Sequence, residues 1–108
     1  MNRLNRLVAF KDSVRSWGNK IGVNPKRVQV QKMTKKWASC SSKGQITFST
    51  DLLKQEKAFR EVVIVHELLH LNVGNHGKLF KSLMNAYLPD WEIKTKGRIV
   101  QIYGQGKL

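Results

Sequence analysis

Residues 62–77 read VVIVHELLHLNVGNHG and contain all three histidines of the chain. Positions four apart on a helix lie on the same face, so His66 and His70 can direct their imidazoles at one point. Glu67 lies beside them and completes the pattern H-E-x-x-H, in which two histidines hold zinc and the glutamate takes the proton of a metal-bound water. The stretch therefore predicts a helix that binds metal and carries hydrolytic chemistry.

A third histidine follows close enough in the sequence to reach the same metal ion. His76 is six residues beyond His70, across a turn that could fold it back over the helix, so it is the candidate third ligand of one Zn²⁺ ion. Catalytic zinc sites keep three protein ligands and leave a position for water or substrate. Two alternatives remain open: His66 and His70 are ordinary polar residues of a buried helix, or His76 only caps the helix that follows.

The residues before this stretch predict one helix and a small sheet. Apolar residues recur at steps of three and four over residues 2–21, which is typical of an amphipathic helix. Residues 27–31 alternate with period two, as a half-buried strand does. An extended run around residues 35–39 leads into a turn at residues 42–44 and a second alternating run at residues 45–49, which indicates a hairpin.

The residues around and after the histidines predict two more helices. No Gly or Pro interrupts residues 52–71, which favours one largely buried helix that carries His66 and His70. Gly74 is expected to take a left-handed conformation after the last turn. Helical spacing resumes over residues 78–88 and stops at Pro89. The expected fold is α+β: an N-terminal helix, a sheet of about three strands, the zinc-binding helix, a following helix and an extended C-terminal tail.

Length and composition limit the classes of protein to which the chain can belong. A chain of 108 residues forms one small domain. No apolar run reaches the roughly 20 residues of a membrane-spanning helix, and the single cysteine, Cys40, excludes an internal disulfide and favours a reducing, cytoplasmic location. The formal net charge is +13, and residues 1–50 carry eleven Lys or Arg against one acid. This charge permits nucleic-acid binding, although a solvated basic face is the preferred interpretation.

Two separate motifs resemble a known family. Residues 37–44 read WASCSSKG and precede the strand at residues 45–49, while H-E-L-x-H-L at residues 66–71 precedes Asn75-His76 and Lys78-x-Phe80. In this order they resemble the catalytic core of the YgjP-like metal-dependent hydrolases. The chain is especially similar to minigluzincins of the proabylysin type, which are small soluble metallopeptidase domains related to the membrane peptidases of the HtpX kind.

This resemblance implies a zinc endopeptidase with peptide or protein substrates. It makes His66, His70 and His76 the zinc ligands and Glu67 the general base. It also implies that the strand at residues 45–49 is an edge strand beside the cleft, to which an extended substrate adds by backbone hydrogen bonds. The implied substrate-binding residues are Gln45, Ile46, Thr47 and Phe48.

Minigluzincins are also associated with latency imposed by a C-terminal segment. The whole chain, residues 1–108, would then be one minimal zincin-like catalytic domain, in which residues 92–108 are a candidate inhibitory tail. The strand-like part of that tail would occupy the cleft and comprises Ile99, Val100, Gln101, Ile102 and Tyr103. The alternative is an ordinary edge strand or a frayed terminus.

Two other functions remain open. The first is a zinc hydrolase of nucleotide phosphoanhydrides, against which stands the lack of a Gly-rich phosphate cradle. The second is a nucleic-acid-associated protease similar to the SprT-like proteins, with the basic first half as its contact surface.

Overall fold

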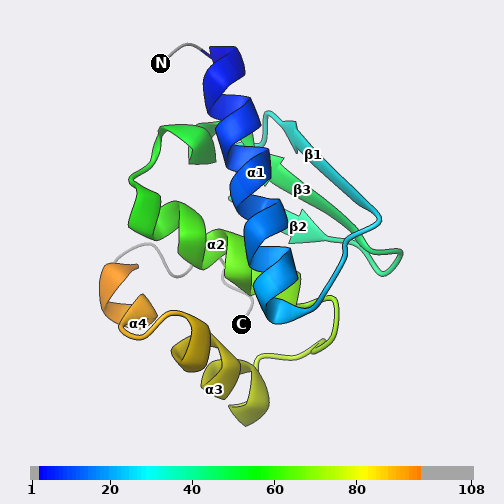
Figure 1. The fold of residues 1–108 in the computed structure, drawn as a ribbon, viewed down its shortest axis with the longest axis vertical. Helices are drawn as coiled ribbons and strands as arrows, with labels where there is room; N and C mark the ends of the chain where they lie inside the picture. Colours follow the sequence, from blue (N-terminus) through cyan, green and yellow to red (C-terminus); the bar gives the residue numbers. More distant parts are fainter. Residues whose placement is uncertain (1–2, 96–108) are drawn as a thin grey trace.

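The computed structural model describes residues 3–95 and has an α+β fold (Figure 1). The expected N-terminal helix, three strands and further helices are present, and residues 96–108, which include most of the expected tail, lie outside the described part. The elements, in chain order, are α1 (Arg3–Ile21), β1 (Arg27–Gln31), β2 (Ala38–Cys40), β3 (Gln45–Ser49), the 3-10 helix η1 (Thr50–Lys54), α2 (Lys57–Leu69), α3 (Lys78–Tyr87) and α4 (Trp91–Lys94).

Helix α1 forms where the periodicity predicts it. Phe10, Val14 and Trp17 follow one another at steps of four and three, and all three are buried because this spacing places them on one helix face. The helix ends at Gly22, whose φ of 84° is readily adopted only by glycine. Trp17 Nε1 donates a hydrogen bond of 3.2 Å to Glu61 Oε2, which links α1 to α2.

The sheet has the order β1-β3-β2, so β3 is its central strand. β1 pairs with β3 in parallel, with Val28 opposite Ile46, and β2 pairs with β3 antiparallel, with Ser39 opposite Thr47. The predicted hairpin is therefore confirmed. The expectation that Gln45–Ser49 is an edge strand is wrong, because β1 pairs with β3 on the side opposite to β2.

The predicted single helix over residues 52–71 is wrong in its first turns. Ser49 Oγ accepts the backbone N–H of Asp51 and starts the separate short helix η1. The backbone is extended at Gln55 and at Glu56, which precedes the first residue of α2. The chain thus turns before α2 begins, although neither Gly nor Pro marks the place. Gly74 also differs from expectation, since it does not have a positive φ.

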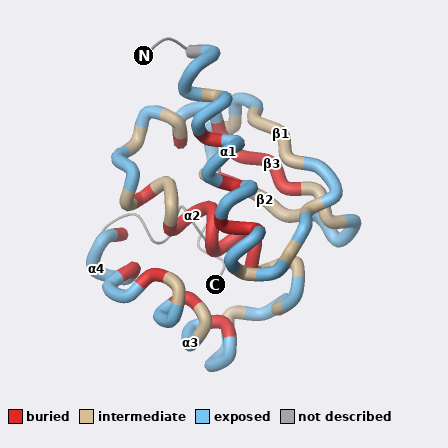
Figure 2. Tube along the Cα trace, in the orientation of Figure 1, coloured by how far each residue is buried: buried red, intermediate tan, exposed pale blue. Residues whose placement is uncertain are grey.

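Helix α2 lies at the centre of the molecule. It contacts α1 and β2 as well as α3 and α4. Every residue from 62 to 69 is buried, which appears in Figure 2 as a continuous buried segment of α2. A helix that is covered on all sides needs apolar residues all round, and residues 62–65 supply them. His66 and Glu67 are therefore held inside the hydrophobic core.

No helix among residues 3–95 is both long enough and apolar enough to cross a membrane.

Candidate metal centre

The three histidines converge on one point. His70 Nε2 lies 2.9 Å from His76 Nε2, and His76 Nε2 lies 3.2 Å from His66 Nε2. One ligand atom from each histidine lies within 4.8 Å of the other two. The pair on α2 meets because residues four apart share a helix face, and His76 arrives from the loop between α2 and α3. The structure thus brings together the three residues that the sequence predicts as ligands.

Hydrogen bonds at the other ring nitrogens orient two of these imidazoles. His66 Nδ1 lies 2.9 Å from Glu67 Oε2, and His70 Nδ1 lies 3.2 Å from the carbonyl oxygen of Val73. A carbonyl or an ionised carboxylate only accepts, so Nδ1 is the protonated nitrogen in both rings and Nε2 carries the lone pair. Both lone pairs therefore face the nitrogen of His76. Hydrogen bonds to the other ring nitrogen orient metal-binding histidines in this way.

The spacing of the nitrogens fits a zinc ion. Zinc–nitrogen bonds of 2.0–2.1 Å in a tetrahedral site place two ligand nitrogens about 3.3 Å apart. The two measured separations, 2.9 and 3.2 Å, are close to that value. Neutral imidazoles are ligands that zinc readily accepts. Two of the three separations therefore match a zinc site, and His66, His70 and His76 together can hold one metal ion.

Phe80 is a contact residue of the site that the sequence interpretation did not identify. It lies on α3 and is completely buried. Its ring centroid lies 5.1 Å from that of His66, 4.8 Å from that of His70 and 4.9 Å from that of His76. One rigid ring thus packs against all three imidazoles and limits their rotation. An aromatic residue four positions after His76, in the first turn of the next helix, is the sequence signal that marks it.

A local turn fixes His76. Asn75 Oδ1 accepts the backbone N–H of Gly77 at 2.9 Å, so the side chain of Asn75 closes a turn around His76. A Cβ atom added at Gly77 would lie 2.9 Å from the same oxygen, which is too close. A side chain at position 77 would therefore require the Asn75 side chain to shift out of this hydrogen bond. The sequence Asn75-His76-Gly77 folds the imidazole back toward α2.

Glu67 is buried at the site, with 3% of its surface exposed. The thiol of Cys40, on β2, is close enough to be affected by its charge: burial, and then the negative charge of Glu67, raise the pKa of Cys40. Strand β2 contacts α2. The sheet therefore borders the metal centre through β2.

The imidazole of His70 favours its neutral form. Burial, followed by the neighbouring His66, lowers the pKa of His70, and Glu67 and the Val73 carbonyl oppose this effect. Only the neutral imidazole can bind a metal. The environment of His70 therefore favours the protonation state that a metal ligand needs.

The predicted substrate-binding residues lie in the described part of the chain, whereas the predicted latency residues do not. Ile46, Thr47 and Phe48 are buried in β3, whose backbone pairs with β1 on one side and β2 on the other. Gln45 to Phe48 thus lack the free edge on which their predicted role depends. The candidate latency residues, 99–103, lie outside the described residues, so their role stays a prediction.

Comparisons with known proteins agree with this geometry. The family model described as "YgjP-like, metallopeptidase domain" matches residues 3–97. The fold matches the metallopeptidase zymogen of Pyrococcus abyssi abylysin, with a TM-score of 0.72 and 22% identity over 84% of this chain and 91% of that chain. It also matches the zymogen of Methanocaldococcus jannaschii jannalysin, with a TM-score of 0.71 and 21% identity over 83% and 96% of the two chains. The comparison with curated proteins gave no match.

Proposed function

Because the chain belongs to the family of YgjP-like metallopeptidase domains, we propose that it is a zinc-dependent endopeptidase in which Glu67 is the general base. The observation that carries the proposal is the convergence of three histidine Nε2 atoms, with Glu67 next to the first of them in sequence. A zinc ion bound there would supply a water of lowered pKa and would polarise the carbonyl group of the substrate.

Residues of the chain would carry out the proton transfers and would position the reacting groups. Glu67 accepts a proton from the attacking water and delivers it to the leaving amine. His66 Nδ1 donates to Glu67 Oε2 and so holds this carboxylate beside the ligand nitrogens. Burial of His66 and Glu67 within the core keeps both side chains in one arrangement, because few rotamers fit a close-packed interior.

The substrate would enter as an extended peptide along β2. Among the described residues, β2 pairs only with β3, so its other edge is open to one further strand. β2 also lies next to the site, since it contacts α2, the helix that carries His66 and Glu67. A peptide with N-methylated amides on both sides of the scissile bond should therefore be a poor substrate. Equal cleavage of the methylated and unmethylated peptides would refute this binding mode.

The enzyme would be made in a latent form. Support comes from the structural similarity to two chains described as metallopeptidase zymogens. Trp91 and Thr95 are buried, so a truncation should keep α4 and remove only residues 96–108. The shortened chain should cleave peptides faster than the full chain. A folded truncation with unchanged activity would exclude inhibition by residues 99–103.

The central test combines metal content with activity. The wild type should retain one zinc per chain, whereas His76→Ala should lose most of it. Glu67→Gln should keep the zinc and lose about 10²–10⁴-fold in cleavage of an unstructured protein, the usual contribution of a general base. A wild type that binds no zinc would contradict the proposal. Hydrolysis of nucleoside triphosphates without peptide cleavage would instead identify a non-peptide hydrolase.

A further inference from the structure

The outer edge of β1 is open in the described part of the chain. β1 is the last strand of the sheet on the side away from β2 (Figure 1), and among residues 3–95 it pairs only with β3. Because β3 lies between them, this edge is separate from the open edge of β2, the candidate substrate strand. An open edge presents N–H and C=O groups to which an extended chain can add.

Two hydrogen bonds show how the backbone groups of β3 point. The carbonyl oxygen of Gln45 accepts the N–H of Ser41 at 2.8 Å. The N–H of Ser49 donates to the carbonyl oxygen of Trp37, also at 2.8 Å. Ser41 and Trp37 flank β2, so Gln45 and Ser49 point toward β2. Since backbone groups alternate in direction along a strand, the even-numbered residues of β3 point toward β1.

The register then identifies the groups of β1 that face the open edge. Val28 lies opposite Ile46, and Val30 lies opposite Phe48. In a parallel pair, a bonded residue reaches the two neighbours of the residue opposite and not that residue itself. Val28 and Val30 therefore direct their N–H and C=O groups away from β3. Each offers one donor and one acceptor to a further strand.

A groove of about 280 Å³ lies beside this edge, between α1 and the start of β1. Val14 of α1, Val23 and Val28 form its apolar lining, and the exposed Lys11 and Arg15 lie on its α1 side. Val28 belongs both to the groove and to the open edge. A strand added to β1 would direct every second side chain to the face that Val28 occupies. An apolar side chain on that face would be removed from water in the groove.

The surroundings of the edge are positively charged. Residues 13–50 contain eight Lys or Arg and no acid. Three of these cations, Lys26, Arg27 and Lys32, belong to β1 or flank it, and all three are exposed. No ion pair among residues 3–95 involves them. Positive charge that is not compensated nearby attracts an acidic partner.

The same charges disfavour a second copy of this chain at the edge. Antiparallel pairing of β1 with itself about Gln29 would place Lys26 opposite Lys32. Like charges directly opposite each other destabilise a strand pair, and both chains carry a formal net charge of +13. The occupant that fits the edge is therefore an extended chain with acidic side chains.

We propose that the open edge of β1 binds an extended acidic segment of another protein by strand addition. The backbone of that segment bonds to Val28 and Val30, its apolar side chains enter the groove, and its acidic side chains lie beside Arg27. A segment in which acidic and apolar residues alternate meets all of these conditions, because the two sets fall on opposite faces of a strand. Binding at this edge requires neither the metal nor Glu67.

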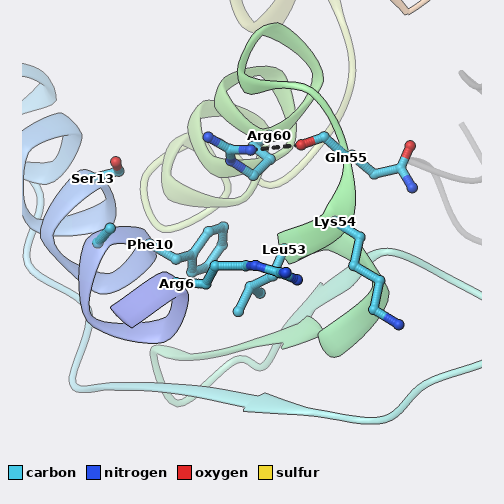
Figure 3. A pocket seen from close by; sticks show the side chains of 8 residues that line it. Arg6, Phe10, Ser13, Leu53, Lys54, Gln55 and Arg60 are labelled. Atoms are coloured by element: carbon cyan, nitrogen blue, oxygen red, sulfur yellow. Dashed lines mark hydrogen bonds between the residues drawn. The ribbon is translucent and has the colours of Figure 1, made fainter. Parts of the chain in front are cut away.

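A separate cationic surface provides a charge control. Arg6, Lys54 and Arg60 line a depression between α1, η1 and the start of α2 (Figure 3). Arg60 Nη1 donates to the carbonyl oxygen of Gln55 at 2.6 Å, and the side chains of Lys54 and Arg60 point apart. None of the residues that line this depression belongs to a strand. Lys54→Glu therefore changes the net charge as much as Arg27→Glu does, at a distance from β1.

Fluorescence anisotropy with a labelled heptapeptide of alternating Glu and Val tests the chemistry of the partner. Glu67→Gln is introduced into every protein sample so that the peptide is not cleaved. The peptide should bind in a saturable manner, and a heptapeptide of alternating Lys and Val should bind at least about tenfold more weakly, because its charge is reversed. Equal affinities for the two peptides, or no saturable binding of the acidic one, would overturn the proposal.

Proline variants test the place of binding. Val30→Pro removes an N–H that faces the open edge, which edge strands tolerate, and should weaken binding about tenfold. Cys40→Pro is the matched control on the open edge of β2 and should bind the acidic peptide as the parent protein does. Unchanged binding in Val30→Pro would refute the location. Weakening in Cys40→Pro alone would place the peptide on the candidate substrate strand and would refute it too.

Charge reversals test the same place without a change in the backbone. Arg27 and Lys54 are both exposed, so their variants keep the proposal testable even if Val30→Pro disturbs folding. Arg27→Glu should weaken binding of the acidic peptide about fivefold or more. Lys54→Glu should change it by less than about twofold. Equal weakening by both variants would show a response to net charge alone and would overturn the proposal.

Two further measurements exclude other occupants. Oligothymidylate of the same charge should displace the acidic peptide poorly, because it cannot add as a strand; displacement as effective as that by unlabelled peptide would overturn the proposal. Analytical ultracentrifugation of the chain without peptide should show a monomer. A dimer that Val30→Pro dissociates would show that a second copy occupies the edge, and it would overturn the proposal as well.

Discussion

Asn75 Oδ1 accepts the backbone N–H of Gly77 at 2.9 Å, and the turn that this bond closes carries His76 to the two histidines of α2. The third nitrogen of the site thus depends on a side chain that makes no contact with the metal position itself. A residue of this kind acts by orienting a ligand.

Asn75→Ala should weaken zinc binding by about 10–100-fold, the usual effect of losing a partner that orients a ligand. The alanine cannot accept the N–H of Gly77, so His76 would sample other positions. Competition with a chelating dye measures the affinity. Asn85→Ala, at an exposed position of α3, is the matched control and should bind zinc as the wild type does. Equal affinities of both variants would contradict the role of the turn.

Phe80→Leu should reduce both stability and zinc affinity. The ring of Phe80 contacts all three imidazoles, and leucine would leave a cavity beside them. Phe59→Leu is the control, because Phe59 is equally buried on α2 and its ring packs against Trp37. Chemical unfolding should show losses of about 1–3 kcal/mol for both variants, and only Phe80→Leu should weaken zinc binding.

Acidification should destabilise the metal-free protein. The pKa of His70 is lowered by burial and by His66, so the unfolded chain binds a proton at this residue more readily than the folded chain. Where the unfolded state binds more protons, the free energy of unfolding falls as pH falls. The loss begins near the unfolded pKa of about 6.5 and continues down to the lowered folded pKa.

Urea unfolding between pH 7.5 and 5.5, in the presence of a chelator, measures this dependence. His70→Asn should show a smaller slope over the same range, because the variant lacks the titrating group. A metal-free wild type that is as stable at pH 5.5 as at pH 7.5 would contradict the assignment.

Cys40 should react slowly with iodoacetamide at neutral pH. Burial, and then the charge of Glu67, raise the pKa of this thiol, and only the thiolate reacts. Unfolding in urea should increase the alkylation rate several-fold. Glu67→Gln should increase it in the folded protein, because the negative charge is removed. Mass spectrometry follows both rates, and an unchanged rate in Glu67→Gln would mean that the carboxylate does not act on the thiol.

Local sequence patterns predicted the helical parts of the site. The four-residue spacing of His66 and His70 fixes a shared face once the segment is helical. The density of apolar residues from Val62 to Val65 explains why that segment is buried. The family motifs also led to the correct family. Each of these features depends on neighbours within a few residues along the chain.

Features that depend on distant contacts were predicted less well. The strand at residues 45–49 was placed at an edge, whereas its parallel pairing with β1 makes it central. No property of either strand sequence determines this order. Helix α4 was not predicted, because the four residues Trp91–Lys94 are too short to show a period. Phe80 was predicted only as part of the motif Lys78-x-Phe80, since its contacts with the histidines require the packing of α3 on α2.

The strand order also has a consequence for biosynthesis. β1 and β2 leave the ribosome before β3, and among the described strands each of them pairs with β3 and they do not pair with each other. Both strands therefore stay unpaired until β3, which ends at Ser49, has been synthesised. Unpaired strands invite association between nascent chains, and positive charges discourage it. Residues 26–43 hold six Lys or Arg and no acid, so the positive charge of the first half of the chain would hinder association of these unpaired strands with other nascent chains.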